Sequence, residues 1–338
     1  MNRFEYIRAN SITDAVKALA GVPDSQALAG GTNLVDLMKY DVARPSRVVD
    51  INRLPLGDIE ETATGGLKIG ALVSNSELAW DSRIAKRYPL LASAILAGAS
   101  PQLRNAATTG GNLLQRTRCY YFYDPSTPCN KREPGTGCSA LEGVNRIHAI
   151  LGASDSCIAV HPSDMCIAMA ALDAVIHLEG PDGARTVRFD EFHRLPADRP
   201  QHDNTMRAGE LITAVELPER GFASYHTYLK VRDRLSYAFA LVSVAAAFEI
   251  EAGAISEARL ALGGVAHKPW RDRGIEQWMR GKIPDEDTFN YCADALLRDA
   301  RGAGHNDFKV ELARRTIVRA MRQAAAGTPQ DQSRKIVR

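Results

Sequence analysis

The stretch RNAATTGGN at residues 104–112 begins a longer segment that ends with HPSD at 161–164. It opens with a Gly-Gly turn flanked by Thr and Asn, and it closes with a typical helix start. Four of the six cysteines lie between these two motifs. Glycines let the backbone approach a ligand closely, and free N–H groups at a helix start favour an anion. The segment therefore predicts a nucleotide-type cofactor on the glycines and a metal centre on the sulfurs.

The bulk composition is that of a globular protein with two or three domains. The chain has 338 residues, of which 45% are hydrophobic and 24% charged, and its net charge is +2. We expect no nucleic-acid partner and no membrane span, because neither a basic run with aromatics nor a long apolar run occurs. MNRFEY at 1–6 resembles a strand rather than a signal segment. An exported protein would have to travel to the periplasm with a signal-bearing partner; otherwise it would be cytoplasmic.

A second Gly-Gly turn lies near the start of the chain, in QALAGGTNL at 26–34. With strands predicted at 4–7 and 48–51 and a helix capped by Ser11, the first 55 residues read as β-α-β-α-β. The motif is not G-x-G-x-x-G, so a nicotinamide Rossmann site is not supported. Two such turns could hold one extended diphosphate ligand, and two unrelated turns are the alternative.

The four clustered cysteines are Cys119, Cys129, Cys138 and Cys157, with the spacing C-x9-C-x8-C-x18-C. Sets of four thiolates hold iron–sulfur clusters or zinc, and zinc sites usually contain close C-x2-4-C pairs, which this spacing lacks. The surrounding Pro, Gly and Tyr residues predict a loop without helix or strand that gains its order from metal ligation. Two disulfides, or free thiols in a surface loop, are the alternative.

Other cysteines and histidines are predicted to be structural. Cys166 and Cys292 occupy apolar positions of expected helices, so we assign both to core packing. His193 and His202 lie in polar loops without ligand spacing, so we expect surface histidines.

The remaining pattern predicts an α+β protein in consecutive parts. Before the C-terminal part we expect a strand at 67–72, a helix from Ser74 or Ser76 to about Tyr88, helices at 89–97 and from 162, a hairpin turning at 181–183 and a strand at 211–218. Within the C-terminal part we expect a strand at 225–231, a hairpin over 241–262, and helices at about 271–280, 285–299 and 307–325. The predicted boundaries are 1–55, 56–220 with an insertion at about 115–160, 221–327, and a polar, frayed tail at 328–338.

Four motifs together resemble one family, the FAD-binding medium subunits of the molybdenum hydroxylases. They are AGGTNL at 29–34, RNAATTGGN at 104–112, PSD at 162–164, and GGVA at 263–266 with Pro269. The resemblance spans nearly the whole chain, with the motifs in the family's order. The cysteine insertion resembles the [4Fe-4S]-bearing variant, for which an aldehyde oxidoreductase is the nearer match and a 4-hydroxybenzoyl-CoA-reductase-like enzyme the alternative.

This resemblance implies a two-part FAD-binding domain of the vanillyl-alcohol-oxidase (PCMH) type, followed by a C-terminal α+β domain with an antiparallel sheet and flanking helices. It implies FAD and one [4Fe-4S] cluster as cofactors, with Cys119, Cys129, Cys138 and Cys157 as cluster ligands. The FAD residues that it implies are Gln26, Ala27, Leu28, Ala29, Gly30, Gly31, Thr32, Asn33, Leu34, Thr108, Thr109, Gly110, Gly111, Asn112, Ser163, Asp164, Ile212 and Lys230.

The implied function is electron transfer within a heterotrimer. A large molybdenum subunit would oxidise the substrate, and a small subunit with two [2Fe-2S] clusters would pass electrons to FAD and then to an external acceptor. We expect no catalytic residue on this chain beyond the flavin, with Lys230 near the ring. A non-catalytic metal-binding assembly module is the rival from another class.

Two positions depart from the family pattern. Gly98 stands where related enzymes place an aromatic residue over the flavin, so an inserted Tyr120 or Tyr121 replaces it or that face is open. Ser236-Tyr237-Ala238 replaces a region that is often acidic.

Overall fold

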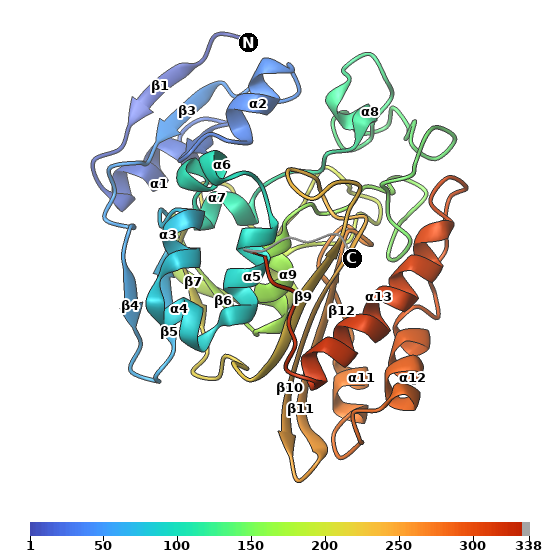
Figure 1. The fold of residues 1–338 in the computed structure, drawn as a ribbon. Coiled ribbons are helices and arrows are strands. Elements are labelled where there is room, and N and C mark those ends of the chain that lie inside the picture. Colours follow the sequence, from blue (N-terminus) through green and yellow to red (C-terminus); the bar gives the residue numbers. More distant parts are fainter. Residues whose placement is uncertain (333–338) are drawn as a thin grey trace.

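The computed structural model describes residues 1–332, which contain three separate β-sheets (Figure 1). The first part has the predicted β-α-β-α-β order. Its elements are β1 (Glu5–Arg8), α1 (Ile12–Ala20), β2 (Gln26–Leu28), α2 (Leu34–Lys39) and β3 (Arg47–Asp50). The strands form a parallel sheet in the order β1-β3-β2, as expected when helices connect consecutive strands. Ser11 caps α1 by accepting a hydrogen bond from the Asp14 N–H, as predicted.

The second part is built on a five-stranded antiparallel sheet in the order β4-β5-β8-β6-β7. Its strands are β4 (Ile59–Glu61), β5 (Leu67–Gly70), β6 (Val175–Gly180), β7 (Gly183–Arg188) and β8 (Leu211–Leu217). Its helices are α3 (Asn75–Trp80), α4 (Ser82–Arg87), α5 (Pro89–Ala97), α6 (Pro101–Ala106), α7 (Thr109–Leu113), α8 (Tyr120–Tyr123), α9 (Asp164–Ala171) and α10 (Phe189–Phe192). Apolar faces of α5 and α9 pack into the main core of the molecule.

Three local predictions in this part are wrong. The single helix expected from Ser74 or Ser76 to Tyr88 is two helices, because Asp81 is extended and its carboxylate accepts hydrogen bonds from the first N–H groups of α4. The second Gly-Gly pair lies inside the short helix α7 rather than in a turn. The cysteine loop, expected to lack helix, contains the one-turn helix α8.

The C-terminal part is a four-stranded antiparallel sheet in the order β12-β11-β10-β9. Its elements are β9 (Tyr225–Val231), β10 (Val242–Glu251), β11 (Ala254–Gly263), β12 (Trp270–Arg271), α11 (Arg273–Trp278), α12 (Glu286–Leu296) and α13 (Phe308–Ala325). Helix α13 lies along β9 and β10, while α5 and α9 contact the same sheet from the second part (Figure 1). The helix expected from Arg271 begins later, because Asp272 caps it and the two residues before Asp272 pair with β11.

The start of the polar tail is ordered along the edge strand β9. The Gln330 N–H donates to Thr227 Oγ1 at 3.0 Å, and Gln330 Oε1 accepts from the Lys230 N–H at 3.2 Å. Gln332 Nε2 donates to the Tyr228 carbonyl at 3.3 Å. The expected fraying is therefore wrong for residues 328–332, and residues 333–338 of the predicted tail lie outside the described residues. Across the described chain, no helix has the length and apolar character that a membrane crossing needs.

Candidate cofactor site

The two glycine motifs lie against each other. A Cβ atom on Gly30 would lie 1.7 Å from the Ala106 carbonyl oxygen, so only glycine allows this approach of the two backbones. Gly31 has φ of +69°, in the left-handed region. Asn33, just after the first turn, accepts a hydrogen bond from the Arg116 N–H at 2.9 Å. The structure thus brings together the two glycine motifs, which are far apart in the sequence.

The starts of α7 and α9 are joined by one side-chain hydrogen bond. Ser163 Oγ caps α9 by accepting from the Cys166 N–H at 3.0 Å, and it donates to Asn112 Oδ1 at 2.6 Å. Thr108 caps α7 by accepting from the Gly111 N–H at 3.3 Å. The second glycine motif and the Ser-Asp helix start therefore belong to one site, although the cysteine loop separates them in sequence.

Asp164 is the centre of a buried polar group behind this site. Its carboxylate accepts from Tyr228 Oη and from Lys230 Nζ, each at 2.7 Å. Lys230 also donates to the Ala97 carbonyl at 3.2 Å, and its side chain is 1% exposed. Burial and the charge of Asp164 raise the pKa of Tyr228 well above its usual value. The Lys230 ammonium, which we expected near the flavin ring, is paired with Asp164.

A cavity of about 650 Å³ opens beside these residues. Its wall contains Ser163 and Asp164, together with residues that sequence reasoning did not assign: Asp36, Tyr40, Arg118, Tyr123, His148, His161, Phe239 and Gly264. The first glycine motif adjoins the wall, because Asn33 Nδ2 lies 3.5 Å from the Tyr123 hydroxyl. Ile212, in contrast, points into the main core, where it is 2% exposed.

The structure distinguishes between the two tyrosines proposed to replace the missing aromatic residue. A side chain at Gly98 would crowd the buried carboxylate, since its Cβ would lie 3.0 Å from Asp164 Oδ2. Tyr120 lines the cavity and is exposed. Tyr121 lines the cysteine hollow instead, and its hydroxyl accepts a hydrogen bond from the Val144 N–H at 2.7 Å. Tyr120 is therefore the inserted aromatic that can contact a ligand in the cavity.

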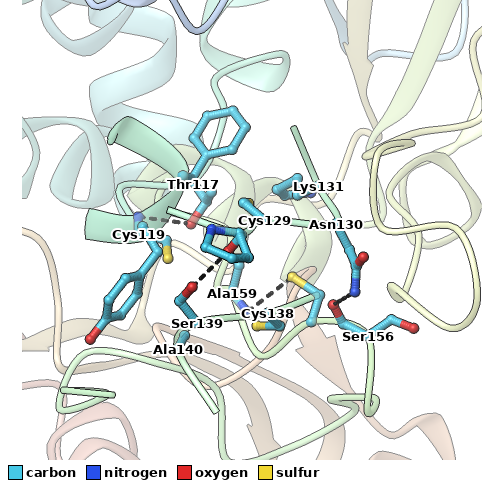
Figure 2. A pocket seen from close by; sticks show the side chains of 14 residues that line it. Thr117, Cys119, Cys129, Asn130, Lys131, Cys138, Ser139, Ala140, Ser156 and Ala159 are labelled. Atoms are coloured by element: carbon cyan, nitrogen blue, oxygen red, sulfur yellow. Dashed lines mark hydrogen bonds between the residues drawn. The ribbon is translucent and has the colours of Figure 1, made fainter. Parts of the chain in front are cut away.

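All four clustered cysteines surround one small hollow in the 116–160 loop. Figure 2 shows Cys119, Cys129 and Cys138 on separate turns of the loop around this common space, and Cys157 completes the wall. All six cysteines of the chain are free, and three of these four are buried. The four thiols are thus unpaired in this structure, and they line an enclosed hollow.

The donor set of the hollow fits a positively charged metal centre. Burial raises the pKa of the Cys119 thiol to about 12 and that of Cys157 to about 11, so thiolates need a nearby cation to form there. His148 Nε2 lies 3.1 Å from Cys119 Sγ. Thr117 and Cys119 line both the hollow and the large cavity, so the two sites share a wall.

Two buried lysines fix the cysteine loop to the rest of the chain. Lys131 Nζ donates to the Pro200 carbonyl at 2.7 Å, contacts His267 Nε2 at 2.7 Å, and forms an ion pair with Asp203. Burial opposes ionisation of Asp203, but the charges of Lys131 and Arg116 outweigh it and hold the pKa of that carboxyl well below its usual value.

The second of these lysines comes from the C-terminal part. Lys309 Nζ, at the start of α13, donates to the carbonyls of His148 at 2.7 Å and Gly264 at 2.6 Å, and burial lowers its pKa to about 7. Neither lysine could be predicted as a buried anchor, because all five partners lie far away in the chain and three of them are backbone carbonyls.

One histidine prediction is wrong. His193 is only 3% exposed, because its loop packs under α9, where its Nε2 donates to the Leu113 carbonyl at 2.9 Å. Its ring lies 4.4 Å from that of His161, and His161, Cys166 and His193 each offer a ligand atom within 4.8 Å of the others. His161 Nδ1 accepts from the Ser163 N–H, while the buried His161 Nε2 and His193 Nδ1 have no hydrogen-bond partner among the described residues. His202 is exposed, and Cys166 and Cys292 are buried in cores, as predicted.

Comparison with known families accounts for both halves of the structure. The family described as FAD binding domain in molybdopterin dehydrogenase matches residues 2–220, and the CO dehydrogenase flavoprotein C-terminal domain matches residues 226–324. The chain belongs to the FAD-binding medium subunits of the molybdenum hydroxylase family. The expected family and fold class are thereby confirmed, and the protein is a subunit of an oxidoreductase.

Individual members of this medium-subunit family are similar over their full length. The aldehyde oxidoreductase FAD-binding subunit PaoB of Escherichia coli K12 is 48% identical, with 96% of this chain and 99% of PaoB aligned. The carbon monoxide dehydrogenase medium chain of Hydrogenophaga pseudoflava is 27% identical over 96% of this chain and 98% of its own. A chain of the crystal structure of quinoline 2-oxidoreductase from Pseudomonas putida 86 superposes with a TM-score of 0.74 at 26% identity, covering 97% of this chain and 98% of that one.

Proposed function

We propose that this chain is the FAD- and [4Fe-4S]-binding electron-transfer subunit of a molybdenum-dependent aldehyde oxidoreductase. The observation that carries the proposal is the shared wall: four cysteines enclose one hollow, and Cys119 also lines the cavity beside the glycine motifs. The aldehyde assignment is supported by the 48% identity to PaoB. FAD supplies one- and two-electron chemistry when bound, and an iron–sulfur cluster supplies one-electron transfer.

The chain's own residues would bind and orient these groups. Gly30 lets the Ala106 backbone approach the first glycine motif, the free N–H groups at the start of α2 would bind the diphosphate, and Ser163 fixes the start of α9 beside the cavity. The Asp164–Lys230 pair neutralises two buried charges behind the cavity wall. Cys119, Cys129, Cys138 and Cys157 would hold the cluster. No acid–base pair is needed on this chain, since substrate chemistry would take place on a partner.

The assembly that we propose contains a large molybdenum subunit and a small subunit with two [2Fe-2S] clusters. Electrons from aldehyde oxidation would reach this chain from the small subunit and leave to an external acceptor. The complex would be periplasmic if a partner carries the export signal.

Spectroscopy and metal analysis of the anaerobically purified protein test the proposal. We expect flavin absorption bands with a broad iron–sulfur shoulder, and about four iron and four sulfide ions per chain, as a [4Fe-4S] cluster requires. Zinc in place of iron, or a protein without flavin, would contradict it. Co-purification with mass spectrometry of the partners, followed by an aldehyde-oxidation assay, tests the assembly and the substrate class.

A further inference from the structure

We propose that His148 is a positioning residue for the cysteine cluster, donating its Nε2–H to Cys119 Sγ and raising the reduction potential of the bound cluster. The proposal rests on the proposed function, because it requires an iron–sulfur centre in the hollow. The two atoms lie 3.1 Å apart, and both residues are buried, at 1% and 7% exposure. The separation is well within hydrogen-bonding range for a sulfur acceptor, and water has little access to weaken the bond.

The tautomer follows from the surroundings of the ring. His148 Nδ1 is buried and has no hydrogen-bond partner among the described residues. A cysteine that ligates iron is a thiolate and can only accept a hydrogen bond. The single proton of the neutral imidazole therefore belongs on Nε2, where it points at the sulfur, and Nδ1 carries the lone pair.

The backbone of His148 is held so that the ring keeps this position. Its carbonyl accepts hydrogen bonds from Lys309 Nζ at 2.7 Å and from Asn306 Nδ2 at 3.2 Å. Its N–H donates to the Asn145 carbonyl at 3.0 Å. Lys309 and Asn306 are themselves fully buried. The C-terminal domain thus fixes a residue of the cysteine loop through two side chains near the start of α13.

The contact lies where the two cofactor sites meet. Of the four clustered cysteines, Cys119 is the one that also lines the large cavity, and His148 lines that cavity too. A hydrogen bond at Cys119 therefore acts on the sulfur nearest to the flavin side. It would set how readily the cluster exchanges an electron with a ligand of the cavity.

The physical effect has a definite sign. Reduction adds negative charge to a cluster, and a hydrogen bond to a ligand sulfur stabilises that charge, so its removal lowers the potential. A charge-assisted hydrogen bond in a buried site corresponds to about a tenfold change in the ratio of reduced to oxidised cluster at a fixed potential. For one electron, this equals a shift of about 59 mV.

The test is a redox titration of the assembled complex, followed by electron paramagnetic resonance. His148→Phe removes the donor while keeping a ring, and His148→Gln restores an N–H. We expect the midpoint potential of His148→Phe to fall by the equivalent of about tenfold, and that of His148→Gln to stay closer to the unmodified protein. The exposed His202→Gln serves as control and should leave the potential unchanged.

Each result separates the two proposals. An unchanged potential in His148→Phe, with iron and FAD content intact, overturns the role of His148 and leaves the proposed function standing. Absence of iron from the unmodified complex overturns both. If His148→Phe loses its iron, His148→Gln and His148→Met are compared instead, because their side chains match in length and only Gln has an N–H donor. A lower midpoint potential in the Met variant supports the proposal. Equal potentials in the two variants refute it.

Discussion

The glycine motifs and the cysteine loop lie side by side but are stabilised in different ways. Around the glycine motifs, short helices begin at caps formed by Ser100, Thr108 and Ser163, and the segments between them pack on the main core. The loop at 116–160 has only the helix α8 and two isolated bridges, one of which pairs Cys129 with Cys138. The first region takes its order from local structure and apolar burial. The second has little regular structure, a small apolar cluster around Phe122 and Ile158, and a few buried polar contacts with other parts of the chain.

The largest difference between the regions should appear when a ligand sulfur is removed. We expect Cys129→Ser to lose essentially all iron and to make the 116–160 loop sensitive to protease, because ligation supplies most of its order. FAD content should fall less. Cys166→Ser, in the core of α9, is the control and should keep its iron. Equal iron loss in both variants would contradict the assignment of ligands.

The matching change on the flavin side is Gly30→Ala. Its Cβ would lie 1.7 Å from the Ala106 carbonyl oxygen, so the two glycine motifs must separate. We expect FAD to bind at least about tenfold more weakly, since a strain of about 1.4 kcal/mol corresponds to that factor. Iron content should be unchanged. Gly57→Ala, in open space before β4, is the comparison and should leave FAD binding intact; unaltered FAD affinity in Gly30→Ala would count against the site.

Lys131 tests whether buried polar contacts hold the cysteine loop. Lys131→Met removes the cation beside Asp203 and should lower the free energy of unfolding by about 3 kcal/mol, because a buried carboxylate loses a partner. Denaturant unfolding measures this. The exposed Arg146–Asp233 pair is the control, and Arg146→Met should change stability by less than about 1 kcal/mol. A similar loss in both variants would show that burial of Lys131 is unimportant.

Asp50, at the end of β3, gives the flavin side a pH dependence. Burial opposes its ionisation, but hydrogen bonds from Tyr6, Asn52 and Arg8 outweigh it and lower the pKa of Asp50 to about 2 from 3.8. The folded state therefore gains stability above about pH 4 and loses it as pH falls toward 2, by about 2 kcal/mol. Asp50→Asn should lack this loss of stability between about pH 4 and 2. Identical pH profiles of the free energy of unfolding in the variant and the unmodified protein would refute the prediction.

The smallest expected effect concerns the tail along β9. Removing residues 328–338 deletes the three hydrogen bonds from Gln330 and Gln332 to the strand that carries Lys230. We expect the free energy of unfolding to fall by about 1 kcal/mol, because water replaces these partners at the sheet edge. Removing only 333–338 retains the three bonds, so the loss of stability in this truncation should be smaller. A thermal unfolding series of the two truncations distinguishes these outcomes.

Much of the regular structure could be predicted from local patterns. The β-α-β-α-β start, the helix at Pro89–Ala97, the hairpin at 181–183 and the C-terminal hairpin follow from periodicity, caps and turn residues. The errors arose where a side chain overrode the pattern. Asp81 divides a helix because its carboxylate caps the next one, and His193 is buried because its loop packs beneath α9. Neither the helix break at Asp81 nor the burial of His193 can be predicted from the spacing of apolar residues alone.

Residue type and spacing alone establish two glycine motifs, a four-cysteine loop between the second of them and the Ser163-Asp164 helix start, and a C-terminal sheet with helices. They can be predicted because glycine allows backbone conformations that other residues avoid, and because thiols are metal ligands. Only the tertiary structure brought Gly30 against Ala106, paired Lys230 with Asp164, and placed His148 on Cys119. Such contacts join residues from separate elements. They depend on how the three sheets pack against each other, and this packing cannot be predicted from the spacing of residues along the chain.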